Sequence, residues 1–218
     1  MSAIEKKLQH ILKSIPEEVT LVAVSKTKPI SDLMEAYTAG QRIFGENKIQ
    51  EMTDKWDQMP KDIIWHMIGH VQTNKVKYMA PYVDTIHAVD SMKLLKEINK
   101  QAAKNNRVVN CLLQIKIAAE ESKFGLSETE AIQLIQAEEI QHMSNIRITG
   151  LMGMATFTDD QKQIKDEFDM IKSLFDTLKT KYSELNTLSI GMSGDYQLAI
   201  DCGSTMVRIG SSIFGTRN

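Results

Sequence analysis

The sequence contains little cysteine, proline or glycine and no long apolar run, and each shortage excludes a class of protein. Its 218 residues include 2 cysteines, 4 prolines and 11 glycines. So few prolines and glycines exclude fibrous and low-complexity chains. No run of ~18 apolar residues is present, so we expect no membrane-spanning helix. Cys111 and Cys202 form no C-x-x-C pair. Two lone cysteines in a chain of this size fit a reducing compartment, so we expect a cytoplasmic protein.

An excess of charge of either sign is also missing. The chain has 26 Lys and Arg against 28 Asp and Glu, a formal net charge of −2. A dedicated nucleic-acid binder needs a basic face, so this balance argues against that class. The N-terminal segment MSAIEKKLQHILKSI mixes charged with apolar residues, unlike a signal peptide. Because no linker-like stretch divides the chain, we expect residues 1–218 to form a single domain.

What the sequence does contain is a regular alternation of strand-like and helix-like segments. An amphipathic helix is predicted over residues 1–15, and Pro16 ends it. Eight strand-like segments follow, starting near residues 20, 42, 63, 83, 108, 146, 187 and 206, and the last two extend to residues 195 and 212. Strands and helices that alternate at this spacing predict parallel strands joined by right-handed crossovers.

Several of the intervening helices carry recognisable start signals. A Ser/Asp cap after Pro29 predicts the start of one helix, and Ser91 is the predicted cap of another. Ser127 and Glu130 have the spacing of a capping box, in which each side chain accepts a hydrogen bond from the backbone of the other.

Eight strand–helix units are the number that closes a TIM-type (β/α)8 barrel, so we expect an α/β fold of this kind with an extra N-terminal helix. An open doubly wound sheet is the alternative. That fold often has a Gly-rich turn after its first strand, whereas SKTKP here contains no glycine.

A (β/α)8 barrel places its site at the C-terminal ends of its strands, which converts the strand prediction into a residue prediction. These ends carry Ser25 to Lys28, Gly45 to Asn47, His66, Gly69, His70, His87, Asp90, Lys116, Met152 to Thr156, Gly191 to Gly194, and Arg208 to Ser212. GMSGD after the seventh strand and IGSS after the eighth are small-residue turns in which backbone N–H groups can hold a phosphate. The simpler interpretation is that Gly-Ser turns only close tight loops.

Lys26 is the second candidate, because it follows the strongly apolar strand VTLVAV. Partial desolvation lowers the pKa of a lysine and suits it to Schiff-base formation. The alternatives are a solvated lysine at Lys26 and a role for Lys28 instead.

Arg208, on an apolar strand, needs an acceptor or anionic partner, which could be a buried salt bridge or a ligand. His66 and His70 have the spacing of zinc ligands, but Met67 replaces the expected Glu, so the metal interpretation is weak.

Taken together, the motifs resemble those of the pyridoxal phosphate homeostasis protein family. The matching blocks are LVAVSKTKP, RIFGENKIQE, WHMIGHVQTNK, ESKFGL, ITGLMGMAT and LSIGMSGDYQLAIDCGSTMVRIGSSIFG, in this order. The family has the barrel of alanine racemase-type proteins that bind pyridoxal 5'-phosphate (PLP). It shows no established turnover and acts in vitamin B6 homeostasis, which makes PLP-dependent apo-enzymes candidate recipients.

The resemblance also implies roles for individual residues. Lys26 would hold PLP as a Schiff base. Ser193, Gly210 and Ser211 would bind the phosphate, Ser211 standing where threonine is common. Arg208 would face the pyridine nitrogen and keep it unprotonated, and Asn47 would line the pocket. His70, Gln72, Asn74 and Lys75 match a family block without an assigned role.

Two enzyme classes remain as alternatives. A PLP-dependent racemase or decarboxylase of the same barrel usually carries a further β-domain and a catalytic partner across a dimer. This chain ends at FGTRN directly after the predicted eighth strand, so we expect it to lack that domain and to be a monomer. A cofactor-free Schiff-base aldolase usually places its lysine on a later strand.

Overall fold

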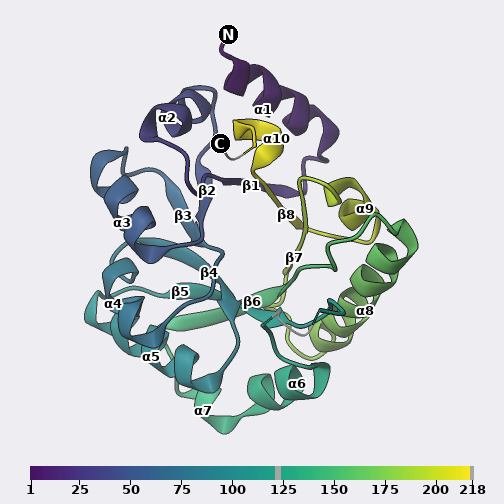
Figure 1. Cartoon of the computed structure of the whole chain (residues 1–218). Helices are drawn as coiled ribbons and strands as arrows, with labels where there is room; N and C mark the ends of the chain where they lie inside the picture. The colour runs from purple at the N-terminus through teal and green to yellow at the C-terminus, as the bar shows by residue number, and fades with distance from the viewer. Residues whose placement is uncertain (121–123, 217–218) are drawn as a thin grey trace.

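The eight predicted strands close into a parallel barrel in the computed structural model, which describes residues 1–120 and 124–216. Each strand pairs with its neighbours in chain order, and β8 pairs with β1 (Figure 1). The strands are β1 (Thr20–Val24), β2 (Ile43–Glu46), β3 (Ile64–Met67), β4 (Val83–Val89), β5 (Val109–Ile115), β6 (Ile146–Gly153), β7 (Thr187–Met192) and β8 (Met206–Ile209). The predicted TIM-type barrel is therefore confirmed, and each strand begins within about one residue of its predicted start.

Helices surround the barrel and connect successive strands (Figure 1). They are α1 (Ala3–Ser14), α2 (Ile30–Thr38), α3 (Ile49–Gln58), the 3-10 turn η1 (Thr73–Lys75), α4 (Val76–Met79), α5 (Met92–Lys104), α6 (Glu128–Gln136), α7 (Glu138–Gln141), α8 (Gln161–Lys179), α9 (Tyr196–Asp201) and α10 (Ser211–Phe214). Among the helices of the described residues, none is both long and apolar enough to cross a membrane.

Local sequence signals explain where several helices begin. The Ser127 hydroxyl accepts a hydrogen bond from the N–H of Glu130, whose carboxylate accepts from the N–H of Ser127, so the predicted capping box of α6 is present. Ser91 caps α5 as predicted, and Asp160 caps α8 in the same general way. The predicted Ser/Asp cap of α2 is wrong, because α2 begins one residue earlier at Ile30, directly after Pro29.

The extra N-terminal helix is also confirmed. Ser2 and Glu5 form a capping box at its start, and Leu8 and Ile11 are buried on its inner side. Figure 1 places α1 beside α2 and α10, so this helix covers the part of the barrel wall where the first and last strands meet.

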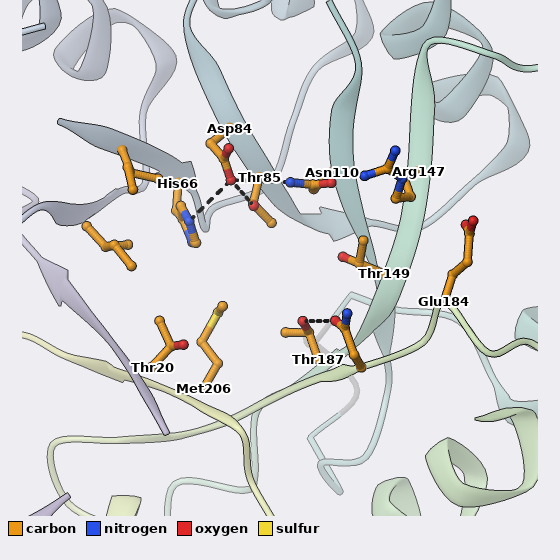
Figure 2. Close-up of a pocket in the computed structure, with 13 residues that line it drawn as sticks. Thr20, His66, Asp84, Thr85, Asn110, Arg147, Thr149, Glu184, Thr187 and Met206 are labelled. Atoms are coloured by element: carbon orange, nitrogen blue, oxygen red, sulfur yellow. Dashed lines mark hydrogen bonds and ion pairs between the residues drawn. The ribbon is translucent and has the colours of Figure 1, made fainter. Parts of the chain in front are cut away.

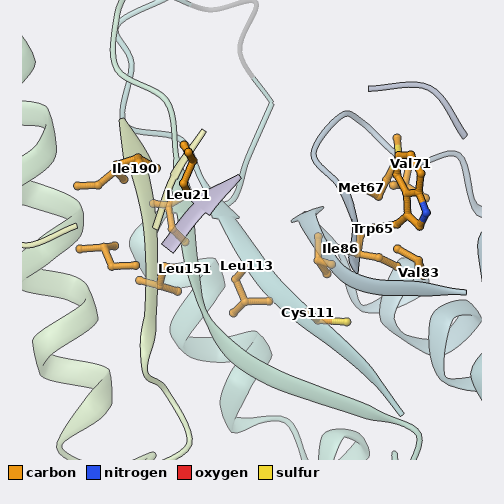
Figure 3. Packing of buried hydrophobic residues seen from close by; sticks show 14 of the residues in the cluster. Leu21, Trp65, Met67, Val71, Val83, Ile86, Cys111, Leu113, Leu151 and Ile190 are labelled. Carbon is orange, nitrogen blue, oxygen red and sulfur yellow. The ribbon is translucent and has the colours of Figure 1, made fainter. Parts of the chain in front are cut away.

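The main apolar core lies between the strands and the helices, because alternate strand residues point outward. Leu21, Leu113, Leu151 and Ile190 are among the fully or nearly fully buried members of this cluster, part of which Figure 3 shows. Burying each such side chain contributes roughly 1.5–3 kcal/mol.

The inside of the barrel differs from this apolar layer. It includes a small apolar cluster of Ala88, Leu112 and Met152, against which Met154 packs. Alongside them, the strands carry the buried polar residues His66, His87, Gln114, Ser189 and Arg208. A barrel of this type is usually filled by branched apolar side chains, so this polar filling calls for a chemical explanation.

Candidate functional site

The six site residues that the sequence singled out all face one cavity at the C-terminal ends of the strands. The cavity has a volume of about 650 Å³. Its lining includes Lys26, Asn47, Ser193, Arg208, Gly210 and Ser211. These residues come from four separate strand ends, so the closure of the barrel is what brings them together.

Lys26 lies in the turn that follows β1 and is half-buried. The neighbouring residues fix this turn from both sides. The N–H of Ser25 donates to the carbonyl of Gly45 over 3.0 Å, and the N–H of Thr27 donates to Glu51 Oε1 over 2.6 Å. Thr27 has a φ of 64°, an uncommon conformation for a residue with a side chain. The turn is thus held in a specific shape around the lysine.

The buried ion pair between Lys55 and Glu46 contacts the same turn and stabilises it. Lys55 Nζ donates to the Ser25 carbonyl over 2.8 Å and to Glu46 Oε1 over 2.7 Å. The Ser25 hydroxyl donates to the same Glu46 oxygen over 2.6 Å, and Lys55 also contacts Glu51 at 2.8 Å. Burial raises the pKa of Glu46, while the charge and hydrogen bond of Lys55 oppose that rise. Lys55 was not among the residues predicted from the sequence, although its i, i+4 spacing from Glu51 was a usable signal.

The structure also separates the two candidate lysines. Both line the cavity, but Lys28 Nζ donates to the carbonyl of Thr216 over 3.0 Å in a solvent-exposed hydrogen bond. Lys26 stands on the turn that the contacts of Ser25, Thr27 and Glu51 fix, and the choice between the two lysines stays a prediction.

The two small-residue turns meet on one wall of the cavity. Gly191 has a φ of 95°, and a Cβ there would lie 2.6 Å from the Cβ of Ala199, so glycine is required where β7 turns. The carboxylate of Asp195 accepts from the N–H of Met192 over 2.5 Å and closes the GMSGD turn. Ser193 Oγ then accepts from the N–H of Gly210 over 3.2 Å, which joins this turn to the one after β8.

These turns differ from the predicted strands in one respect. The seventh strand was expected to reach residue 195 and the eighth residue 212, but they end at Met192 and Ile209. The residues beyond them form the two turns and the short helix α10. Gly210 lies against β1, since a Cβ on it would be 3.0 Å from the carbonyl oxygen of Val24, two residues before Lys26.

Arg208 lies between the turns and the barrel interior and is 4% exposed. Its Nη1 donates to the carbonyl and to the hydroxyl of Ser189, both over 2.7 Å, and its Nη2 donates to the carbonyl of Gly153 over 2.9 Å. Burial lowers the pKa of Arg208 to about 10, and the negative charge of Asp195 opposes that fall. The side chain therefore stays cationic at neutral pH, and these three hydrogen bonds all go to neutral oxygens.

Asn47 is positioned by a close backbone contact. A Cβ on Gly69 would lie only 2.4 Å from the carbonyl oxygen of Asn47, so the absence of a side chain at Gly69 lets the two strand ends approach. The N–H of Ile68 donates to the carbonyl of Glu46 over 2.9 Å and continues the β2–β3 pairing up to this point.

The rim of the cavity carries residues whose roles the sequence left open. His70 lines the cavity, stacks on Phe124 with ring centroids 5.0 Å apart, and lies 3.6 Å from Asp90. Gln72, Asn74 and Lys75 are exposed in or beside η1. Residues 121–123 of the ESKFGL block lie outside the described residues.

The expectation that His66 and His87 belong to the C-terminal mouth is wrong. Both lie within their strands, and their rings contact each other inside the barrel, His66 Nδ1 being 2.9 Å from His87 Nε2. His66 therefore points away from His70. Within residues 1–120 and 124–216, no group of three or more His, Cys, Asp or Glu could hold a metal ion.

Comparison with known proteins gives a consistent result. The family model described as "Alanine racemase, N-terminal domain" matches residues 1–218. The pyridoxal phosphate homeostasis protein of Vibrio alginolyticus is 39% identical over 233 residues, which cover 100% of this chain and 99% of that protein. The protein of the same name from Escherichia coli K12 is 40% identical, covering 93% of this chain and 88% of its own length.

Solved structures show the same similarity at the level of the fold. PipY of Synechococcus elongatus PCC7942, solved without PLP, superposes with a TM-score of 0.90 at 31% identity, covering 97% of this chain and 100% of PipY. PipY with PLP bound gives a TM-score of 0.87 at 30% identity, with the same coverage. An alanine racemase of Clostridium difficile 630 gives 0.79 at 15% identity, with 98% of this chain but 56% of the racemase covered, so this likeness concerns the fold alone.

Proposed function

The chain belongs to the alanine racemase N-terminal domain family and, within it, to the pyridoxal phosphate homeostasis proteins, and from that premise we propose that it binds pyridoxal 5'-phosphate and buffers or delivers this cofactor. Residues 1–218 would act as one PLP-binding domain. One observation carries the proposal: a lysine on a fixed turn, two joined phosphate-type turns and a buried arginine face the same cavity.

The residues present fit the cofactor chemically. PLP offers an aldehyde that condenses with a primary amine, a phosphate, and a pyridine ring that draws electrons. Lys26 supplies the amine and would hold PLP as a Schiff base. Ser193 and Ser211 would bind the phosphate through their hydroxyl groups, and Gly210 through its N–H, which would turn to the phosphate from Ser193 Oγ. The two turns meet beside Val24, so a phosphate bound to them would lie next to the turn that carries Lys26.

Arg208 and Asn47 would line the ring. A guanidinium has no acceptor atom, so beside the pyridine nitrogen it can only donate a hydrogen bond, and it keeps that nitrogen unprotonated. An unprotonated nitrogen weakens the ring as an electron sink, which suits storage of the cofactor better than catalysis on it. The oxygens that accept from Arg208 are neutral, so these hydrogen bonds hold its guanidinium without neutralising its charge.

The first test is the amount of bound PLP, released by alkali and compared with the protein concentration. We expect a yellow protein whose absorbance band is removed by borohydride, and Lys26→Ala should remove the band. Lys28→Ala is the matched control and should keep it, because Lys28 is held by Thr216. A colourless protein that gains no band with added PLP would contradict the proposal.

The second test separates delivery from turnover. We propose PLP-dependent apo-enzymes as recipients and a cytoplasmic monomer as the acting form; both cysteines, Cys111 and Cys202, are free and buried, as suits a reducing compartment. Loaded protein should activate an apo-enzyme in the presence of a phosphatase that destroys free PLP. Racemase or decarboxylase activity that survives purification and is lost in Lys26→Ala would instead support a PLP-dependent enzyme.

A further inference from the structure

A chain of polar contacts runs through the inside of the barrel from one mouth to the other. Arg208 Nη1 is 2.7 Å from Ser189 Oγ, and Ser189 Oγ is 3.2 Å from His87 Nδ1. His87 Nε2 is 2.9 Å from His66 Nδ1, and His66 Nε2 is 3.7 Å from Asp84 Oδ2. We call these five residues the barrel chain. Its middle members are fully or nearly fully buried.

The Asp84 end of the barrel chain, which we call its lower end, faces a second cavity of about 560 Å³ at the N-terminal ends of the strands. Figure 2 shows His66 directed toward Asp84 within this cavity. The carboxylate also accepts from the Thr85 hydroxyl over 2.7 Å and from the Asn110 amide over 3.4 Å, and it is 44% exposed. One end of the chain thus faces the proposed cofactor and the other faces solvent.

The two end groups, Arg208 and Asp84, fix the donor-to-acceptor direction of the contacts between them. A guanidinium only donates, and an ionised carboxylate only accepts. Ser189 Oγ accepts from Arg208, so its own proton is available to His87 Nδ1. His87 then carries its proton on Nε2 and donates to His66 Nδ1. His66 in turn carries its proton on Nε2, where it points at Asp84.

The opposite direction fails at the lower end. It would place the unprotonated Nε2 of His66 against the carboxylate of Asp84, where two electron pairs face each other at 3.7 Å. It would also remove the acceptor of the Ser189 proton, since His87 Nδ1 would become a donor. Burial further favours neutral rings, because desolvation lowers the pKa of His66 to about 4 and that of His87 well below its usual value.

We propose that His87 is a positioning residue for Arg208, and that Asp84 at the far mouth sets the direction of the barrel chain through which it acts. His87 orients the Ser189 hydroxyl, and the oriented hydroxyl holds the guanidinium. The effect on the cofactor rests on the proposed function of Arg208, whereas the direction of the barrel chain does not.

The direction is tested on PLP-free protein by nitrogen NMR of the histidine rings at neutral pH. Both His66 and His87 should be neutral, with the proton on Nε2 and an unprotonated Nδ1. His66→Gln and His87→Gln assign the signals. A proton on Nδ1 of either ring, or a charged ring, would overturn the proposed direction.

The role of the far carboxylate is tested by a matched pair of variants. Asp84→Ala removes the carboxylate that faces His66 Nε2, and Glu184→Ala removes a carboxylate that lines the same cavity on the other side of the view in Figure 2. Asp84→Ala should introduce the second tautomer of His66, while Glu184→Ala should leave both rings unchanged. Identical spectra for the two variants would show that Asp84 does not set the direction.

The positioning role is tested on PLP-loaded protein. Glutamine can accept from Ser189 and donate to His66 as histidine does, whereas phenylalanine can do neither. His87→Phe should shift the absorption maximum and release PLP roughly tenfold faster, as expected when a hydrogen bond to a charged group weakens. His87→Gln should stay close to wild type in both measurements. If His87→Phe does not fold, Ser189→Ala removes the same link with a smaller change.

The outcomes separate the two proposals. A wild-type protein without PLP but with the expected tautomers would contradict the proposed function and leave the barrel chain intact. A loaded His87→Phe or Ser189→Ala protein with an unshifted spectrum and normal release would overturn the positioning role alone.

Discussion

The hydroxyl of Ser193 accepts a hydrogen bond from the backbone N–H of Gly210 over 3.2 Å. This contact joins the turn after β7 to the turn after β8, and the second turn rests against Val24 of β1. The last two strand ends and the first one therefore form a continuous wall next to the turn that carries Lys26.

Ser193→Ala should weaken PLP retention without abolishing binding. The change removes both the link to Gly210 and a hydroxyl donor, and a hydrogen bond to a charged group contributes about 1.5–3 kcal/mol. We expect PLP release at least tenfold faster, measured by dilution into a PLP trap. Ser212→Ala, which alters a neighbouring serine outside the cavity lining, should release PLP at the wild-type rate; equal effects of the two changes would contradict this assignment.

Lys55→Met should destabilise the protein strongly, because it leaves the buried carboxylate of Glu46 without its cation. Breaking a buried pair in this way costs about 3–5 kcal/mol. The double variant Lys55→Met/Glu46→Gln should recover part of this loss. Urea unfolding at pH 7 measures all three proteins, and a double variant no more stable than Lys55→Met would contradict the interpretation.

The same ion pair predicts a dependence on pH. Burial raises the pKa of Glu46 above 4.5, and losing Lys55 removes two effects that lower it. The folded variant therefore binds a proton at Glu46 that the unfolded chain releases, so the contribution of Glu46 to its stability rises as pH falls from neutrality toward 4.5. Lys55→Met should accordingly lose less stability, relative to wild type, at pH 5 than at pH 7. Urea unfolding at the two pH values measures this difference, and an equal loss at both would contradict it.

Acid should destabilise the wild-type protein through its buried histidines. The pKa of folded His66 is lowered from 6.5 to about 4, so the unfolded chain takes up this proton first. The contribution of the neutral His66 ring to the free energy of unfolding is therefore fully present above pH 6.5. It decreases as the pH drops toward 4, by about 1.4 kcal/mol per pH unit for each proton that the unfolded chain takes up. His66→Gln should show a shallower decline in urea unfolding between pH 6.5 and 4.5, and an unchanged slope would argue against this source of acid sensitivity.

Gly69→Ala should disturb the site, while Gly194→Ala should not destabilise the fold. A Cβ on Gly69 would lie 2.4 Å from the backbone oxygen of Asn47, whereas a Cβ on Gly194 meets nothing within 4 Å. Forcing a methyl group into a packed position costs about 1–3 kcal/mol. Thermal unfolding of the two variants provides the comparison, and equal melting temperatures would argue against the close approach of Gly69 and Asn47.

Local sequence patterns predict much of this architecture. The positions and lengths of the apolar runs predict the first residue of every strand to within about one residue. This works because a buried parallel strand is a short apolar run, a pattern that few other elements show. The caps at Ser91 and Ser127 are predictable for a similar reason, since the hydrogen bonds of a cap join residues only three positions apart. The ends of β7 and β8 are not, because Gly191 lies inside β7 while Gly194 and Gly210 lie beyond the strands, so a glycine alone does not mark where a strand ends.

Some residues of the candidate site could likewise be predicted from the sequence, and others could not. That Lys26, Ser193, Gly210 and Ser211 lie at one cavity was predictable, because a barrel exposes the residues that follow its strands. The support of Lys55 for the lysine turn could not be found this way, since it joins residues 30 positions apart. The strand-end rule predicts His66 and His87 at the C-terminal mouth, whereas they lie inside the barrel, because the rule does not say how deep in the barrel a side chain lies.

The number of strands and the chemical types at each strand end can be derived from the chain alone, because each strand is marked by its own short apolar run and the turn residues after it. Which of those groups meet depends instead on how the barrel closes. Pairing of β8 with β1 brings Gly210 to the lysine turn, and the inward faces of four strands align Arg208, Ser189, His87 and His66. Such contacts follow from barrel register, which joins residues far apart in the chain and which no local pattern encodes.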